Sequence, residues 1–216
     1  NGNELTPKIA KQNNLKTAVG AWISQDTEQN QKEIDALIKL GKAGLVDIAV
    51  VGNEVLLRNE LTEAGLLSYI KEVKSALPDI PVACVEAYYI FNEHHKLIET
   101  CDVILMNCYP FWEGAHIDIA TSYLRQMYHI VKENAQGKPV MIAETGWPNL
   151  GSNTEEAQPS LLNAIRYFVN VNQWAKAEDI DLFYFSSFDE SWKVHHEGDV
   201  GDRWGIWDKN ENLKYN

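Results

Sequence analysis

Two glutamates, Glu54 and Glu144, each lie at the end of an apolar run and each stand in an unusual setting. Glu54 closes the sequence Val-Val-Gly-Asn-Glu, and Glu144 opens Glu-Thr-Gly-Trp-Pro. Two carboxyl groups that face one substrate can break a glycosidic bond. One protonates the leaving oxygen, and the other attacks the anomeric carbon or activates water. Aromatic rings close to them can stack on sugar rings. These residue types therefore point to glycoside hydrolysis.

A third polar and aromatic group follows the last apolar run, where Phe-Asp-Glu-Ser-Trp-Lys occupies positions 188–193. A single glutamate at the end of a strand is usually a solvated surface residue. Three such groups, each directly after an apolar run, favour one shared site over three unrelated surface positions.

The elements that must position these residues alternate regularly along the chain. Strands are expected at 16–22, 45–53, 81–87, 102–108, 139–144 and 181–188, and helices at 5–12, 26–42, 62–76, 94–99, 117–134 and 160–177. Asp26 and Thr27 are both candidate caps for the helix that starts near residue 26, and Thr62 for the next one, whereas Gly44 and Pro78 are expected just past helix ends. Alternating strands and helices predict right-handed crossovers and a parallel sheet.

Two parallel α/β folds fit this alternation, an open doubly wound sheet and a closed (β/α)8 TIM barrel. The open sheet normally carries a glycine-rich turn after its first strand, whereas Trp22 is followed by Ile-Ser-Gln-Asp. In a barrel, the carboxyl ends of all strands meet at one rim, where active sites are built. Glu54 and Glu144 would then face each other across that rim, so the motifs favour the barrel.

Only six strands are expected, so the prediction is a (β/α)8 barrel whose first two βα units are missing from this chain. Residues 1–216 are interpreted as a single catalytic domain that is incomplete at its N-terminus. An open barrel would expose two strand edges, which natural proteins avoid. A second chain or copy that completes the barrel is therefore a further expectation.

The motifs at these strand ends make the sequence resemble glycoside hydrolase family 17, the β-1,3-glucanase group, in its short bacterial form. The stretches that carry the resemblance are 20–22, 50–56, 107–112, 143–148, 188–193 and 204–208. The resemblance implies a (β/α)8 barrel and a retaining mechanism, with Glu54 as acid/base and Glu144 as nucleophile. A retaining pair stands about 5–5.5 Å apart.

The residues around this pair are expected to contact a glucan chain. They are Asn53, Tyr109, Phe111, Trp112, Trp147, Glu190, Trp192 and Lys193. Tyr109 is also expected to donate a hydrogen bond to Glu144, because a nucleophile must stay ionised and a donor stabilises the charged form. Trp204 and Trp207 are expected to be packing residues that close the bottom or the rim of the barrel.

Composition excludes several other classes of function. The net charge of −12 would repel a nucleic-acid backbone. No apolar run reaches the length of about 20 residues that a membrane span needs. Cys84, Cys101 and Cys108 lack the spacing of a zinc site and are interpreted as buried thiols. Two carboxylates suffice for the chemistry, so no cofactor or metal is expected.

The sequence thus predicts a retaining, endo-acting hydrolase of laminarin-like β-1,3-glucan. Two alternatives stay open: a β-1,3-glucan transglycosylase, which shares the covalent intermediate, and a non-catalytic glucan-binding or envelope domain. The expected location is secreted, periplasmic or at the cell surface.

Overall fold

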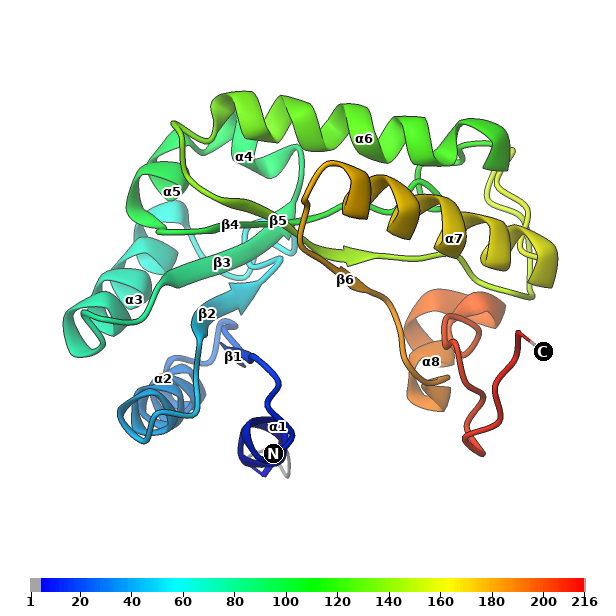
Figure 1. Cartoon of the computed structure of the whole chain (residues 1–216). Helices are drawn as coiled ribbons and strands as arrows, with labels where there is room; N and C mark the ends of the chain where they lie inside the picture. Colours follow the sequence, from blue (N-terminus) through cyan, green and yellow to red (C-terminus); the bar gives the residue numbers. More distant parts are fainter. Residues whose placement is uncertain (1–4, 216) are drawn as a thin grey trace. The chain divides into compact units, whose positions relative to one another are not determined.

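The computed structural model describes residues 5–215 and contains one sheet with the strand order β1-β2-β3-β4-β5-β6 (Figure 1). The strands are β1 Ala18–Ala21, β2 Ile48–Asn53, β3 Val82–Ala87, β4 Ile104–Asn107, β5 Val140–Thr145 and β6 Leu182–Tyr184. The pairs β1–β2, β2–β3 and β5–β6 are parallel. The expected α/β class is therefore confirmed.

Helices occupy the crossovers between successive strands. The longer ones are α2 Thr27–Lys42, α3 Glu63–Ala76, α6 Ile117–Asn134 and α7 Leu161–Ala177. The shorter ones are α1 Thr6–Gln12, α4 Ile90–Glu93, α5 His95–Thr100 and α8 Val194–Glu197, with 3-10 turns η1 Ser191–Lys193 and η2 Gly198–Val200. In the part of the chain that the structure describes, no helix has the length and apolar character needed to cross a membrane.

The helix starts follow local capping chemistry. The side chain of Asp26 accepts the backbone N–H of Gln29, and that of Thr62 accepts the N–H of Gly65. Each cap satisfies one of the donors that the first turn of a helix leaves open. Asp26 and Thr62 are confirmed as caps, whereas Thr27, the other candidate, is already the first residue of α2.

Strand β6 is shorter than the 181–188 expected from its apolar run. The N–H of Phe185 still donates to the Thr145 carbonyl of β5 at 2.8 Å, whereas that of Ser186 donates to the Trp204 carbonyl at 3.2 Å. Trp207 N–H likewise donates to the Ser187 carbonyl at 2.9 Å. Residues 186–188 therefore pair with the C-terminal segment. That prediction was wrong because the partner of these residues lies far along the chain.

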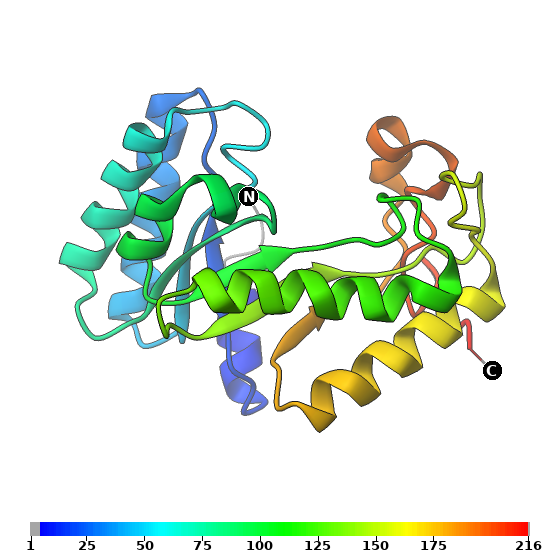
Figure 2. The ribbon, with the colours of Figure 1, turned by 90° about the horizontal axis from the view of Figure 1, so that it is seen from above.

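The chain forms two compact units. The first comprises residues up to Leu105 together with Val131–Val140, and the second comprises Met106–Ile130 and Met141–Asn216. In the first unit, α2 and α3 pack against β1, β2 and β3 and lie side by side (Figures 1 and 2). Strand β3 is buried along its whole length, as expected for a parallel strand covered on both faces.

The second unit is rich in aromatic side chains. Among the largest fully buried residues of the chain are Trp147, Trp204, Tyr167 and Phe111.

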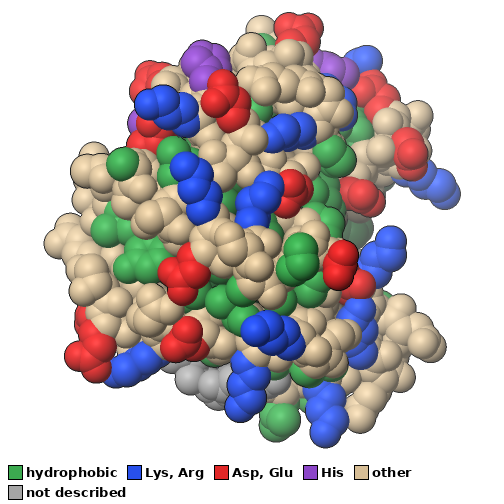
Figure 3. Space-filling view, turned by 90° about the vertical axis from the view of Figure 1, so that its left-hand side faces the viewer, with side chains coloured by type: hydrophobic (Ala, Val, Ile, Leu, Met, Phe, Trp, Pro, Cys, Tyr) green, Lys and Arg blue, Asp and Glu red, His purple; other side chains and the backbone are tan. Residues whose placement is uncertain are grey.

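The three cysteines, Cys84, Cys101 and Cys108, are buried free thiols, as the sequence predicted. On the face shown in Figure 3, acidic and basic side chains are interspersed rather than separated into single-sign fields.

Candidate active site

The end of β2 bends sharply at Gly52 and Glu54. Gly52 has φ +80°, and a Cβ atom there would lie 2.4 Å from a methyl group of Val55, so only glycine fits. Glu54 has φ +54°, a left-handed conformation that is uncommon for a residue with a side chain. Its N–H donates to the carbonyl of Val85 on β3 at 2.8 Å. Strained backbone of this kind gathers at functional positions.

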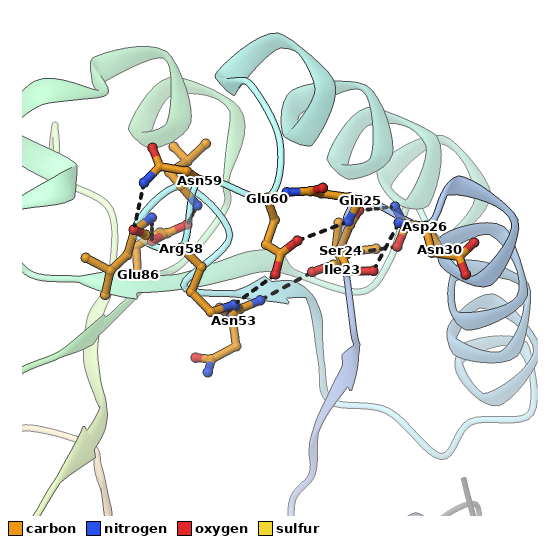
Figure 4. A network of polar contacts seen from close by, with 12 residues as sticks. Ile23, Ser24, Gln25, Asp26, Asn30, Asn53, Arg58, Asn59, Glu60 and Glu86 are labelled. Carbon is orange, nitrogen blue, oxygen red and sulfur yellow. Dashed lines mark hydrogen bonds and ion pairs between the residues drawn. The ribbon is translucent and has the colours of Figure 1, made fainter. Parts of the chain in front are cut away.

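Arg58 ties this bend to its surroundings. Its guanidinium donates to the backbone carbonyls of Asn53 and, at 3.4 Å, of Ile23 (Figure 4). Nε lies 3.7 Å from a carboxylate oxygen of Glu60. The guanidinium also stacks on the indole of Trp22, 4.4 Å from the ring centroid. A planar group with five donors suits this role better than an ammonium would.

Sequence reasoning missed Glu86, a fully buried carboxyl group on β3 (Figure 4). Its two oxygens accept the backbone N–H groups of Leu56 at 2.8 Å and Leu57 at 3.4 Å. Burial raises the pKa of Glu86, and the two N–H groups oppose that effect; the charge of Glu54 raises the pKa further, whereas that of Arg58 lowers it. In the sequence, Glu86 could have been noticed as the single charged residue within the apolar run Val-Ala-Cys-Val-Glu-Ala.

The end of β5 presents Glu144. The hydroxyl of Tyr109 donates to its Oε2 at 2.6 Å, which is the contact that the sequence predicted. The backbone carbonyl of Glu144 accepts the N–H of Cys108 at 3.0 Å. A short hydrogen bond from a phenol stabilises a carboxylate in its ionised form.

The two residues after Glu144 fix the backbone at this strand end. Thr145 and Tyr167 share a buried hydrogen bond between their hydroxyls at 2.6 Å. A Cβ atom at Gly146 would lie 2.1 Å from the carbonyl oxygen of Phe185, so glycine is required there. The position of Glu144 is therefore determined by packing on both sides of the chain.

Trp204 supports the phenol that holds Glu144. It is buried, and its ring centroid lies 5.4 Å from that of Tyr109 in an edge-to-face arrangement. Its indole N–H donates to Glu197 at 2.9 Å. The expected packing role of Trp204 is therefore confirmed.

Two predicted glucan contacts require correction. Phe111 and Trp147 have no exposed surface, and their rings pack against each other with centroids 5.5 Å apart. The indole N–H of Trp147 donates to the carbonyl of Gln158 at 3.0 Å. A sugar can stack only on an open ring face, so these residues pack the interior instead. Burying such large apolar rings is strongly favourable.

The other predicted aromatic contacts have accessible rings. Trp112 is 42% exposed and Trp192 is 61% exposed, so stacking on a sugar stays a prediction for both. The Lys193 side chain is only 14% exposed and lies 3.6 Å from Glu190 and 3.5 Å from Glu197. Its Nζ also lies 3.8 Å from the ring centroid of Phe185. These contacts of Lys193 therefore stabilise its own segment, residues 185–197.

Within each unit the structure brings some of the predicted residues together. Asn53 and Glu54 share the first unit with Arg58 and Glu86. Tyr109 and Glu144 meet in the second unit, as do Glu190 and Lys193. Among residues 5–215, no three His, Cys, Asp or Glu side chains gather in a way that could hold a metal ion.

Comparison with known protein families identifies this chain. A family profile described as the BtgE/BtgC glycoside hydrolase domain matches residues 1–205. The chain belongs to this family.

Similar curated proteins come from several fungi. A glucan 1,3-beta-glucosidase of Saccharomyces cerevisiae is 28% identical over 91% of this chain and 70% of that protein. One of Arthroderma benhamiae is 31% identical over 96% of this chain and 73% of that protein. The putative glucan endo-1,3-beta-glucosidase btgC of Aspergillus niger is 28% identical over 93% of this chain, which spans only 33% of that protein.

A solved structure shares the fold closely. The glycoside hydrolase family 17 β-1,3-glucanosyltransferase of Rhizomucor miehei is 34% identical with a TM-score of 0.88, over 98% of this chain and 79% of that one. An active-site mutant of that enzyme was solved in complex with laminaritriose, with the same TM-score, 33% identity and coverage of 97% and 78%. The resemblance to family 17 and the barrel-type α/β fold are thus confirmed. The bacterial form stays a prediction.

Proposed function

We propose that this glycoside hydrolase domain cleaves β-1,3-glucan chains internally by a retaining double displacement. Glu144 is the nucleophile and Glu54 the acid/base. The observation that carries the proposal is the 2.6 Å hydrogen bond from Tyr109 to Glu144. It supports a carboxylate that stays ionised and fixed in direction, as attack on an anomeric carbon requires.

In the first step, a carboxylate oxygen of Glu144 forms a bond to the anomeric carbon as the glycosidic bond breaks. Glu54 gives its proton to the departing oxygen. In the second step, Glu54 takes a proton from water, whose oxygen attacks the anomeric carbon and releases Glu144. Two inversions restore the β configuration. Both carboxyl groups begin the next cycle in their original protonation states.

A neutral polymer fits the charge and the exposed rings. The net charge of −12 disfavours acidic glycans. The exposed indoles of Trp112 and Trp192, with Asn53 and Glu190, offer stacking and hydrogen-bonding groups for sugar rings. The names of the similar proteins support β-1,3-glucan as the substrate class. A polymeric substrate outside the cell agrees with a secreted, periplasmic or cell-surface location.

Residues 1–216 act in this proposal as one catalytic domain. That a second chain or copy completes the barrel stays a prediction. Neither step of the proposed chemistry calls for a cofactor.

Incubation with laminarin tests the proposal. Reducing ends should appear, and chromatography should resolve a ladder of laminari-oligosaccharides early in the reaction, with Glu144→Gln as the inactive control. Glucose as the sole early product would contradict endo action. Binding of laminarin without release of reducing ends would favour a non-catalytic glucan-binding domain.

Transfer is the second candidate, because the Rhizomucor miehei relative at 34% identity is a glucanosyltransferase. Transfer and hydrolysis share the covalent intermediate and differ in whether a sugar hydroxyl or water takes it up. Products longer than a supplied laminari-oligosaccharide would reveal transfer.

A further inference from the structure

Glu86 is a buried carboxyl group for which the proposed mechanism has no use. It lies on β3 among Val82, Ala83, Cys84, Val85 and Ala87, and its exposure is 0%. Burial of a carboxyl group is unfavourable unless hydrogen bonds or opposite charge offset it. An alanine or valine would suit the strand better, so the carboxyl group calls for a separate explanation.

The offsetting contacts all come from the turn that follows Glu54. Oε1 of Glu86 accepts the N–H of Leu56 at 2.8 Å, and Oε2 accepts that of Leu57 at 3.4 Å. The carbonyl of Glu54 begins this turn by accepting the N–H of Arg58 at 2.9 Å. Each oxygen of Glu86 thus binds one donor that the turn leaves open.

Strand register brings Glu86 close to Glu54. Asn53 pairs with Val85 in the parallel ladder, and the N–H of Glu54 donates to the Val85 carbonyl. Glu54 and Glu86 directly follow this pair of residues on the two neighbouring strands. The charges of Glu54 and Arg58, both from the turn, act on the Glu86 carboxyl group, and Glu86 in turn raises the pKa of Cys84 on its own strand.

We propose that Glu86 is a positioning residue for Glu54: it holds the turn that aims this carboxyl group, and it places a second carboxyl group beside it. This inference rests on the proposed role of Glu54 as acid/base. Two neighbouring carboxyl groups repel each other when both are ionised, and this repulsion raises the pKa of Glu86. Removal of the Glu86 charge therefore changes the electrostatic environment of Glu54, the group that must give a proton to the leaving oxygen.

Two substitutions distinguish the effect of the Glu86 charge from the effect of its side-chain length. Glu86→Gln keeps the length and an acceptor for Leu56 but removes the charge. The basic limb of the kcat/KM profile, measured on laminarin, should move to lower pH by about half a unit or more. Glu86→Asp keeps the charge but shortens the side chain. Its basic limb should stay in place, while kcat falls about tenfold because the turn loses its anchor.

Glu72→Gln on the outer side of α3 is the matched control, since it removes an exposed carboxylate of the same unit. Its profile should coincide with that of the parent. An unmoved basic limb in folded Glu86→Gln would overturn the coupling. A Glu86→Asp variant with the kcat of the parent would overturn the positioning role. This measurement alone tests the proposal if Glu86→Gln does not fold.

Carbon-13 NMR titration of the Glu54 carboxyl group distinguishes failure of this inference from failure of the proposed function. Its midpoint should fall in Glu86→Gln relative to the parent, whether or not laminarin is cleaved. An inactive parent with a shifted midpoint would reject the proposed function alone. An active parent with an unshifted midpoint would reject the role of Glu86.

Discussion

The ends of β2 and β5 each present one of the two candidate carboxyl groups, and their surroundings differ in kind. Glu54 lies in a turn held by charged side chains: Arg58, its ion-pair partner Glu60, and the buried Glu86. Glu144 accepts a hydrogen bond from a neutral phenol, Tyr109, whose ring packs against Trp204. Charged side chains therefore surround Glu54, whereas aromatic side chains surround Glu144.

This difference matches two chemical tasks. A group that must release and regain a proton benefits from neighbouring charges that set its protonation equilibrium. A nucleophile must stay ionised and hold its direction, which a single strong donor on a rigid aromatic support provides. The comparison agrees with the proposed roles, acid/base for Glu54 and nucleophile for Glu144.

The largest effect is expected from Glu144→Gln. An amide cannot form the glycosyl ester, so kcat on laminarin should fall by at least about 10⁴-fold while folding and glucan binding persist. Glu156→Gln, which changes an exposed carboxylate of the same unit, should leave kcat unchanged. Residual activity above about a tenth of the parent would move the nucleophile elsewhere.

Glu54→Ala should lower kcat on laminarin by about 10³-fold, because the first step loses its acid and the second its base. An aryl β-glucoside needs little protonation of its leaving group, so its first step should survive. Added azide should then restore turnover and give a β-glucosyl azide, detected by NMR.

The anomeric configuration decides this second test. A β-azide requires attack on an α-linked intermediate and so supports the retaining assignment. An α-azide would mean direct displacement on the substrate and would reverse the comparison between the two strand ends.

Tyr109→Phe should have an intermediate effect. The ring can still pack against Trp204, but the donor to Glu144 is lost, so kcat should fall about 10- to 100-fold with little change in KM. Tyr69→Phe on α3, outside both strand ends, is the control. A large rise in KM with unchanged kcat would show that the hydroxyl binds substrate instead of holding the nucleophile.

Arg58→Lys is expected to have the smallest effect. The ammonium keeps the charge but cannot bond two carbonyls and stack on Trp22 at once. Urea unfolding should show a loss of about 1–2 kcal/mol in the free energy of unfolding. Arg125→Lys, at an exposed ion pair with Glu178, should change this value by less than about 0.5 kcal/mol. Equal losses would contradict the special role of the turn.

Much of the fold was predictable, because the signals are local. The caps at Asp26 and Thr62 join residues three positions apart, and the helix 117–134 was predicted at the bounds that the structure has. Strand β6 was predicted too long, because residues 186–188 pair with the segment around Trp204 and Trp207. An apolar run reveals burial but not which distant segment provides the hydrogen bonds.

For the candidate site, the sequence by itself predicted Glu54 and Glu144 as the reacting carboxyl groups, which stays a prediction, and the contact of Tyr109 with Glu144, which the structure confirms. Residue type and position at the end of a strand carry that information. Tertiary structure decided that Phe111 and Trp147 turn inward and that Glu86 holds the turn after Glu54. The direction of a side chain after a strand depends on what folds against it, and the bond from Leu56 to Glu86 joins residues 30 positions apart. Contacts between residues so far apart in the sequence form only when the interior packs, so no local sequence pattern predicts them.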